Sequence, residues 1–201
     1  GLLAIARVFM SLAAMDIGTA FGTLGARRDM MIGFLAEPAL LMVIFVASLL
    51  SATTALPLIA ERLVVQPLAL YPSLAFTAVA FTMVLLAENA RIPVDNPATH
   101  LELTMIHEAM LLEYSARHLA LMEWAAALKL FNYACIGFAL FVPWGASIGE
   151  TGVGALALSI PALLAKLGVA GLWLALLETV SAKLRVFRAP EFMATAFMFA
   201  V

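Results

Sequence analysis

The chain has 201 residues, 65% of them hydrophobic and 12% charged, and its mean hydropathy is +1.06. Soluble globular domains carry about 25% charged residues, so this composition excludes a soluble domain and indicates an integral membrane protein. The formal net charge of −2 gives no basis for a nucleic-acid partner, and none is expected.

Transmembrane helices need about 20 mostly apolar residues. No segment shows the alternating pattern of a membrane barrel, so helices are expected throughout. The predicted fold class is all-α: a polytopic transmembrane helix bundle that forms a single integral membrane domain over residues 1–201. Four complete spans are expected at 31–56, 68–87, 119–143 and 153–177, and two partial ones at 1–14 and 191–201.

The two ends of the chain suggest a fragment of a longer membrane domain. Gly1 is not followed by a basic stretch before the apolar residues, so no signal peptide is predicted. The sequence also stops inside an apolar run. The single Cys135 lies in an apolar segment and is expected to be a small buried hydrophobe, without a disulfide or a cysteine metal site.

The connections between spans differ in charge. Residues 15–30, 88–118 and 179–190 together carry seven Lys and Arg residues, whereas 57–67 and 144–152 carry one. The positive-inside rule therefore places the first three in the cytoplasm. We expect these three loops to form a docking surface for a cytoplasmic partner.

Residues 88–123 hold six of the thirteen acidic residues and all three histidines. Ionisable groups are costly next to lipid, so a dense group of them between spans is a candidate functional site. Pro93 and Pro97 predict an ordered turn over 91–99. A helix is then expected from about His100 through the 110s, with a capping box formed by Thr99 and Glu102.

On that predicted helix Glu102 and Glu113 are eleven residues apart and share a face. Glu113 and Arg117 have the spacing of an ion pair, and Glu123 follows inside the apolar segment. Such a row of carboxylates can relay protons, because burial and like charges raise carboxyl pKa values toward neutrality. The alternative is a salt-bridged, solvated helix that packs on a partner.

Other charged residues stand within apolar segments. Glu37 and Lys129 lie deep in predicted spans and are functional candidates. Arg7, Lys166 and Glu178 lie nearer to helix ends, where long side chains can extend to the membrane surface.

Two motifs do not predict sites. The segment from His107 begins like a zinc protease helix, but Leu111 stands where the second histidine ligand is needed, so no metal is expected. Gly18, Gly22 and Gly25 lack the spacing and the preceding strand of a nucleotide site. These glycines are expected to shape a tight loop.

Residues 88–97, Glu-Asn-Ala-Arg-Ile-Pro-Val-Asp-Asn-Pro, resemble the loop Glu-Thr-x-Arg-x-Pro-x-Asp-x-Pro of the respiratory complex I subunit 1 family, with Asn89 in place of Thr. Glu113-Tyr114-Ser115, Glu123 and the basic segment 181–193 also match that family. The resemblance covers essentially the whole chain, and it implies the third to eighth of the family's eight helices.

The hydrogenase branch of that family is the closer match. Residues 15–22, 100–108 and 183–192 resemble the membrane subunit found in formate hydrogenlyase (subunit 4) and hydrogenase-4 (component C). The quinone-reducing branch has more acidic residues after the second proline of the loop, where this chain has Ala98-Thr99-His100.

The resemblance implies a membrane-anchor and coupling subunit of a group 4 nickel–iron hydrogenase in a prokaryotic inner (plasma) membrane. Such a subunit belongs to an oxidoreductase complex but holds no cofactor, no redox centre and no catalytic residue itself. The nickel–iron centre and iron–sulfur clusters are expected in cytoplasmic partners, the hydrogenase large and small subunits. Antiporter-like membrane subunits and the lipid bilayer are the other expected partners.

This reading assigns two sets of residues. The proton or sodium relay is expected to use Glu37, Glu88, Asp95, Glu102, Glu113, Glu123 and Lys129. Loop structure and docking of the arm are expected to use Arg27, Arg28, Arg91, Pro93, Pro97, Arg117, Lys183, Arg185 and Arg188.

Two other functions remain open from the sequence. The first is the quinone-binding subunit of a proton-pumping NADH dehydrogenase, which needs a quinone cavity between the first cytoplasmic loop and the charged residues. The second is a standalone secondary transporter, which predicts inverted repeats or matched broken helices; neither is visible in the sequence.

Overall fold

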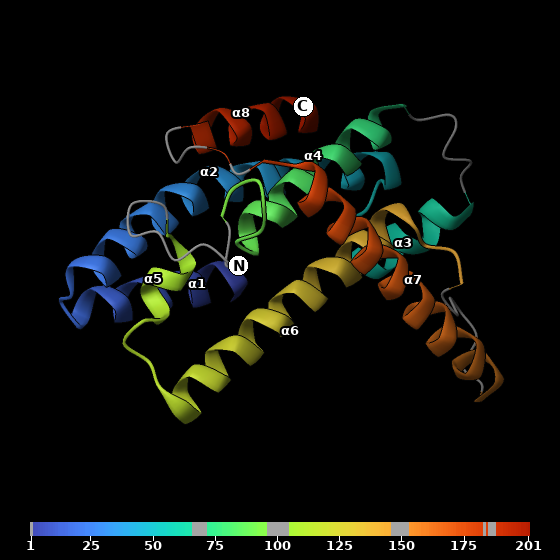
Figure 1. The fold of residues 1–201 in the computed structure, drawn as a ribbon. Helices are drawn as coiled ribbons and strands as arrows, with labels where there is room; N and C mark the ends of the chain where they lie inside the picture. Colours follow the sequence, from blue (N-terminus) through green and yellow to red (C-terminus); the bar gives the residue numbers. More distant parts are fainter. Residues whose placement is uncertain (1, 66–71, 96–104, 146–152, 183, 185–187) are drawn as a thin grey trace.

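The computed structural model describes residues 2–65, 72–95, 105–145, 153–182, 184 and 188–201. All regular structure in these residues is helical, without strands (Figure 1). The helices are α1 (Leu2–Asp16), α2 (Ala20–Ser51), α3 (Leu56–Val65), α4 (Pro72–Glu88), α5 (His107–Leu111), α6 (Ala116–Phe141), α7 (Val153–Val180) and α8 (Ala189–Ala200).

A tight turn joins α1 to α2. Gly18 takes a positive φ of 75°, and its backbone N–H donates to Met15 O at 3.1 Å. Thr19 is the N-cap of α2, and its Oγ1 accepts the N–H of Gly22 at 3.3 Å. The expectation of a loop over 15–30 was therefore wrong for most of that range, because Thr19 starts the helix at Ala20.

The length of α2 explains how it can carry charges at its start. Its 32 residues extend over about 48 Å at about 1.5 Å per residue. This exceeds the hydrocarbon thickness of a bilayer, about 30 Å. The helix can therefore span the membrane and still place its first turns beyond the hydrocarbon. The predicted span 31–56 did not include these first turns.

Several helices pack around α2. Helices α1, α4, α5 and α8 all contact it, and α4 also contacts α8 (Figure 1). Small residues dominate these contacts, as is typical where membrane helices approach closely. The buried alanines are Ala26, Ala36, Ala39 and Ala47 on α2, Ala80 and Ala87 on α4, and Ala189, Ala196 and Ala200 on α8.

Larger side chains hold α6 against the bundle. Tyr133 of α6 is buried, and its ring lies 6.4 Å from the ring of Phe81 on α4. The Phe81 ring also lies 5.6 Å from Phe141. Gly137 leaves room for Phe81, because a Cβ there would lie 2.8 Å from the Phe81 ring.

Within the described residues, three helices are long and apolar enough to cross a membrane: α2, α6 and α7 over Ala157–Val180. Helix α4 is apolar, and its described part has 17 residues from Pro72 to Glu88; residues 68–71 of the predicted span lie outside the described residues. The predicted loop 57–67 is replaced over most of its length by α3. Helices α6 and α7 match the predicted spans 119–143 and 153–177 closely.

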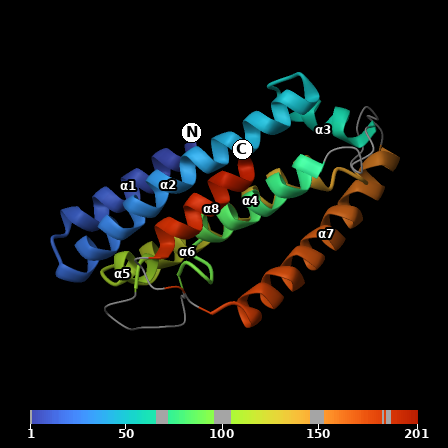
Figure 2. The ribbon, with the colours of Figure 1, turned by 90° about the horizontal axis from the view of Figure 1, so that it is seen from above.

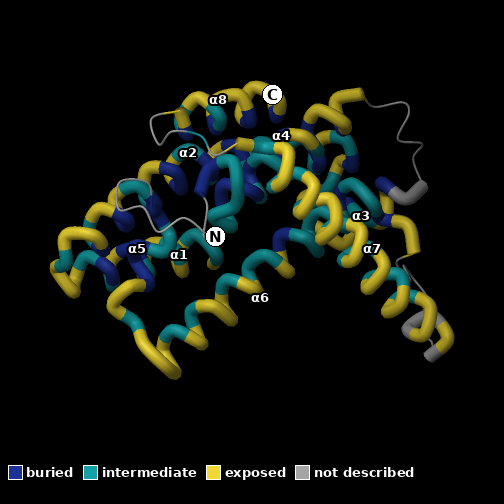
Figure 3. The backbone as a smooth tube through the Cα atoms, viewed as in Figure 1, coloured by how far each residue is buried: buried dark blue, intermediate teal, exposed yellow. Residues whose placement is uncertain are grey.

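Helix α7 stands apart from the rest of the bundle. Its main neighbour among the described helices is α6, and its most apolar stretch has no buried residue (Figure 3). Lys166 of α7 donates to Val142 O, just beyond the end of α6, at 2.6 Å. This contact satisfies a carbonyl that the end of a helix leaves without an intrahelical partner.

Over the described residues, the helix expected from His100 through the 110s is interrupted rather than continuous. Met105 and Ile106 are not helical, α5 covers only His107–Leu111, and Ser115 is extended with φ −134° and ψ 160°. Thr99 and Glu102 lie outside the described residues. Because the turn at 112–115 separates α5 from α6, Glu113 and Arg117 do not share a helix, and among the described residues no ion pair joins them.

The described parts of the three predicted cytoplasmic segments lie at one end of the bundle (Figure 2). The start of α2, the end of α4, α5, the start of α6 and the end of α7 gather there. Helix α3 and the start of α7 lie at the opposite end. The described parts of the segments rich in Lys and Arg thus share one end of the bundle; that this end faces the cytoplasm stays a prediction.

The contact between α5 and α2 depends on Gly25. A Cβ at this position would lie 2.7 Å from Ile106 O and 2.8 Å from the Ala109 Cβ. We expect Gly25→Val to lower the free energy of unfolding by about 1–3 kcal/mol, because extra atoms in a close-packed contact force the backbone apart. Thermal unfolding of the full-length protein in detergent would measure this change.

Gly168→Val on α7 is the matched control, because no atom lies within 4 Å of a Cβ built there. Equal melting temperatures for the two variants would contradict the tight α2–α5 contact.

Candidate functional site

A pair of oppositely charged side chains joins α1 to α2. Arg7 Nε donates to Asp29 Oδ2 at 2.8 Å, and Arg7 Nη2 lies 2.8 Å from Asp29 Oδ1. Ser11 Oγ donates a longer bond to Asp29 Oδ2 at 3.4 Å. This bidentate geometry is the strong form of an arginine–carboxylate pair.

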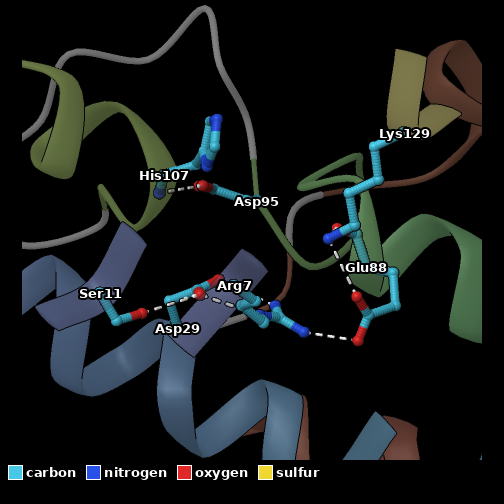
Figure 4. A network of polar contacts seen from close by, with 7 residues as sticks. All are labelled: Arg7, Ser11, Asp29, Glu88, Asp95, His107 and Lys129. Atoms are coloured by element: carbon cyan, nitrogen blue, oxygen red, sulfur yellow. Dashed lines mark hydrogen bonds and ion pairs between the residues drawn. The ribbon is translucent and has the colours of Figure 1, made fainter. Parts of the chain in front are cut away.

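Glu88 extends this pair to α4 and α6. Arg7 Nη1 donates to Glu88 Oε1, and Lys129 Nζ lies 3.0 Å from Glu88 Oε2 (Figure 4). Lys129 Nζ also donates to the Glu88 backbone carbonyl at 2.6 Å, at the C-terminal end of α4. Arg7, Asp29, Glu88 and Lys129 thus form one ion network across four helices, hereafter the ion network.

The ion network is well shielded from solvent. The side chains of Arg7, Asp29 and Glu88 are 10%, 9% and 3% exposed. The two positive and two negative charges of the network cancel, which makes their burial tolerable. Removing one partner of a buried pair would leave an unpaired charge, which costs several kcal/mol. Tyr133 is buried within electrostatic range of Glu88, Arg7 and Glu37.

A second set of contacts fixes the segment that follows α4. Asp95 is buried, and its Oδ2 accepts the backbone N–H of His107 at 3.0 Å, at the start of α5. Pro93 O accepts the N–H of Leu184 at 2.8 Å. Arg28 Nη1 donates to Met105 O at 3.0 Å, which ties α2 to the residues before α5.

A cavity of about 230 Å³ opens beside these contacts. It lies between residues 89–91, α5 and α6, and its polar lining consists of Asn89, Arg91, His107, Glu108 and Glu123. The buried Oδ1 of Asn89 accepts no hydrogen bond from any described residue. The cavity has room for several water molecules, each of which occupies about 30 Å³ in the liquid, and water would satisfy this oxygen.

His107 is neutral at pH 7 in this environment. Burial lowers the pKa of the imidazole, and the nearby Lys129 lowers it further. The carboxylates of Asp29, Asp95 and Glu108 act in the opposite direction but do not offset burial, so the pKa stays below its ordinary value.

The predicted relay residues do not all come together. Glu88 and Lys129 join the ion network, Asp95 holds α5, and Glu37 is half-buried near Tyr133. Glu123 lines the cavity but is otherwise exposed, and Glu113 is exposed in the turn before α6, so the described residues do not form one continuous row. Glu102 lies outside the described part.

The predicted docking residues also separate. Arg27, Arg117 and Arg188 are exposed, and all three lie in segments predicted to be cytoplasmic. Arg91 lies 3.6 Å from Glu178 and so fastens the loop to the end of α7, as Arg28 fastens α2 to Met105. Pro97, Lys183 and Arg185 lie outside the described residues.

Sequence reasoning missed the importance of Arg7 and Asp29. Arg7 was expected to extend from a helix end to the membrane surface, but it is buried at the centre of the ion network. Asp29 was counted as part of a loop. The available signal was that an arginine in an apolar segment requires a carboxylate, and Asp29 stands two residues before the predicted span.

The described residues contain no group of three or more His, Cys, Asp or Glu side chains placed to hold a metal ion. The cavity and the ion network contain ionisable and hydrogen-bonding groups.

Two known proteins are similar in sequence to this chain. The chain is 32% identical to formate hydrogenlyase subunit 4 of Escherichia coli (strain K12) over 199 residues, 99% of this chain and 64% of that protein. It is also 32% identical to hydrogenase-4 component C of the same organism over 144 residues, 72% of this chain and 44% of that protein. The chain thus spans less than two thirds of the length of either relative.

The family comparison covers every residue. Residues 1–201 match the family described as NADH dehydrogenase. Together with three helices long and apolar enough to span a bilayer, this match identifies a membrane protein. The chain belongs to the NADH dehydrogenase family of membrane subunits, the family of complex I subunit 1.

Proposed function

We propose that this chain is the membrane-anchor and coupling subunit of a nickel–iron hydrogenase complex of the formate hydrogenlyase or hydrogenase-4 type. It would link electron transfer in a cytoplasmic arm to the movement of H⁺ or Na⁺ across a prokaryotic inner membrane. The names of the two E. coli relatives support the type of complex.

The observation that carries the proposal is the ion network. Four charged side chains from α1, α2, α4 and α6 meet in this network, and three of them are at most 10% exposed. Ionisable groups buried in a membrane protein are expensive and mark ion pathways by default. Glu88 belongs to this network and also stands at the first position of the loop that resembles the family motif.

The network can transmit a charge change because its members share partners. Arg7 holds both Asp29 and Glu88, and Glu88 holds both Arg7 and Lys129. A proton bound at one carboxylate weakens that pair and strengthens the competing one. A charge change near the arm would therefore shift the protonation of the next group in turn.

The exposed arginines at the same end provide the docking surface for the arm. Arg27, Arg117 and Arg188 are solvent-exposed at the start of α2, the start of α6 and the start of α8. Because salt screens exposed charge pairs, salt should weaken the docking of the arm on these arginines. The apolar surface of α7 fits the lipid bilayer or a neighbouring antiporter-like membrane subunit.

The first test is purification of the full-length protein from its native membrane, with the copurifying subunits identified by mass spectrometry. We expect a nickel–iron large subunit and iron–sulfur proteins, and we expect hydrogen evolution by the complex to move ions in inverted membrane vesicles. Repeating the measurement with a protonophore and with a sodium ionophore shows whether the ion that moves is H⁺ or Na⁺.

Recovery of NADH dehydrogenase subunits with bound quinone would replace this proposal by a quinone-linked function. Recovery of the chain alone, with transport activity, would replace it by a secondary transporter.

A further inference from the structure

The guanidinium group of Arg7 lies against the backbone of α2 at Gly33. A Cβ at Gly33 would lie 3.0 Å from Arg7 Nη1, 3.1 Å from its Cδ and 3.2 Å from its Cζ. Heavy atoms in ordinary van der Waals contact are about 3.5–4.0 Å apart. Any side chain at this position would therefore press on the guanidinium group.

Asp29 and Gly33 together form a seat for this group. They stand four residues apart on α2, so they lie about one turn apart on the same face of the helix. Asp29 binds Arg7 Nε and Nη2, both at 2.8 Å. The remaining nitrogen, Nη1, lies closest to the position of a Cβ at Gly33, and it donates to Glu88 Oε1 (Figure 4). The seat therefore sets how far Arg7 reaches toward α4.

Glycine at position 33 needs a reason of this kind. A glycine inside a helix lowers the stability of the helix relative to alanine, because glycine loses more backbone freedom on folding. Gly33 is buried within α2, and the three heavy atoms nearest to a Cβ there all belong to Arg7. Gly25, by contrast, leaves room for Ile106 and Ala109. Position 33 is thus the place where α2 accommodates the arginine.

We propose that Gly33 is the positioning residue that lets Arg7 bridge the two halves of the ion network. One half is the Arg7–Asp29 pair, the other is the Glu88–Lys129 pair, and the contact of Arg7 Nη1 with Glu88 joins them. This inference rests on the proposed ion coupling and names the residue that keeps the network continuous.

A side chain at position 33 would divide the network without removing a charge. Arg7 keeps both bonds to Asp29, and Glu88 keeps Lys129 at 3.0 Å. The contact between Arg7 and Glu88 weakens, because Nη1 is the atom that an added Cβ displaces first. A charge change at Glu88 then no longer reaches Asp29 through a shared cation.

The first test measures ion movement by the complete complex in inverted membrane vesicles, with hydrogen evolution driven by reduced viologen. We expect Gly33→Ala to lower the number of ions moved per hydrogen by about threefold and Gly33→Val by about tenfold, because a misplacement of about 1 Å costs up to about 10²-fold. Viologen-driven hydrogen evolution should continue in both variants. Gly168→Ala and Gly168→Val are the matched controls, because no heavy atom lies within 4 Å of a Cβ built at Gly168.

The second test separates this positioning role from simple packing of α1 on α2. Midpoints of thermal unfolding are measured for Gly33→Ala, Glu88→Gln and the double variant. We expect Gly33→Ala to lower the midpoint by about 2–4 °C relative to Gly168→Ala. The same change should lower the midpoint by clearly less in the Glu88→Gln background, because the contact that Gly33 makes possible is already weakened there and changes that share a partner are not additive.

The outcomes separate this inference from the proposed function. A wild-type complex that moves no ion would overturn the coupling function, whereas the unfolding measurements would still report on Gly33. Wild-type ion movement by the Gly33→Val complex, or an effect of Gly33→Ala that is equal with and without Glu88→Gln, would overturn only the role of Gly33. If the Gly33→Val complex does not assemble, the smaller Gly33→Ala change decides both tests.

Discussion

Arg7→Gln is expected to destabilise the protein more than any other single change considered for the bundle. The substitution removes both strong bonds to Asp29 and the contact with Glu88, whereas Glu88 keeps Lys129. Asp29 is then left as a buried carboxylate with only the long bond from Ser11. Breaking a buried ion pair by removing one partner costs about 3–5 kcal/mol.

The measurement is the midpoint of thermal unfolding of the purified full-length protein. Arg27→Gln is the matched control, because Arg27 is an exposed arginine on α2. The double variant Arg7→Gln with Asp29→Asn should recover part of the lost stability, since it removes the unpaired charge as well. Equal unfolding midpoints for Arg7→Gln and Arg27→Gln would refute the structural role of the pair.

Glu88→Gln is expected to separate electron transfer from ion movement. The substitution keeps the size of the side chain but removes the negative charge between Arg7 and Lys129. It also removes the group that would gain and lose a proton. We expect viologen-driven hydrogen evolution to continue and the number of ions moved per hydrogen to fall by at least about tenfold.

Inverted vesicles that contain the assembled complex provide this measurement. Glu191→Gln is the control: Glu191 is an exposed carboxylate in the first turn of α8 and takes no part in the ion network. Normal ion translocation by the Glu88→Gln complex would remove the main support for the coupling function. If the Glu88→Gln complex does not assemble, the same measurement is made on the Lys129→Gln complex, because this change leaves Glu88 paired with Arg7.

Composition and apolar patterns predicted the class of protein and much of its helical layout. The apolar composition allowed only a membrane protein, and long apolar stretches marked α6 and α7 to within a few residues. The motif at 88–97 indicated the family that the comparison later matched. Glu88 and Lys129 were identified as candidates because charges in apolar segments are costly.

Local patterns failed where one residue changed the course of the backbone. Thr19 caps α2 early, so the charged residues 27–29 extend a membrane helix instead of forming a loop. Ser115 is extended and Ala116 takes a positive φ of 46°, which separates α5 from α6 despite a sequence compatible with one helix. Helix ends depend on such single conformations, which composition and periodicity do not report.

The pairing of the charges depends on how the helices pack. Arg7 contacts Asp29 across 22 residues of sequence and Glu88 across 81, and no local spacing predicts contacts at that separation. The predicted row of carboxylates relied on one helix, whereas the observed network is formed by packing of α1, α2, α4 and α6 through small residues. The sequence determines that each buried charge needs a partner, and the packing of the helices determines which partner it has.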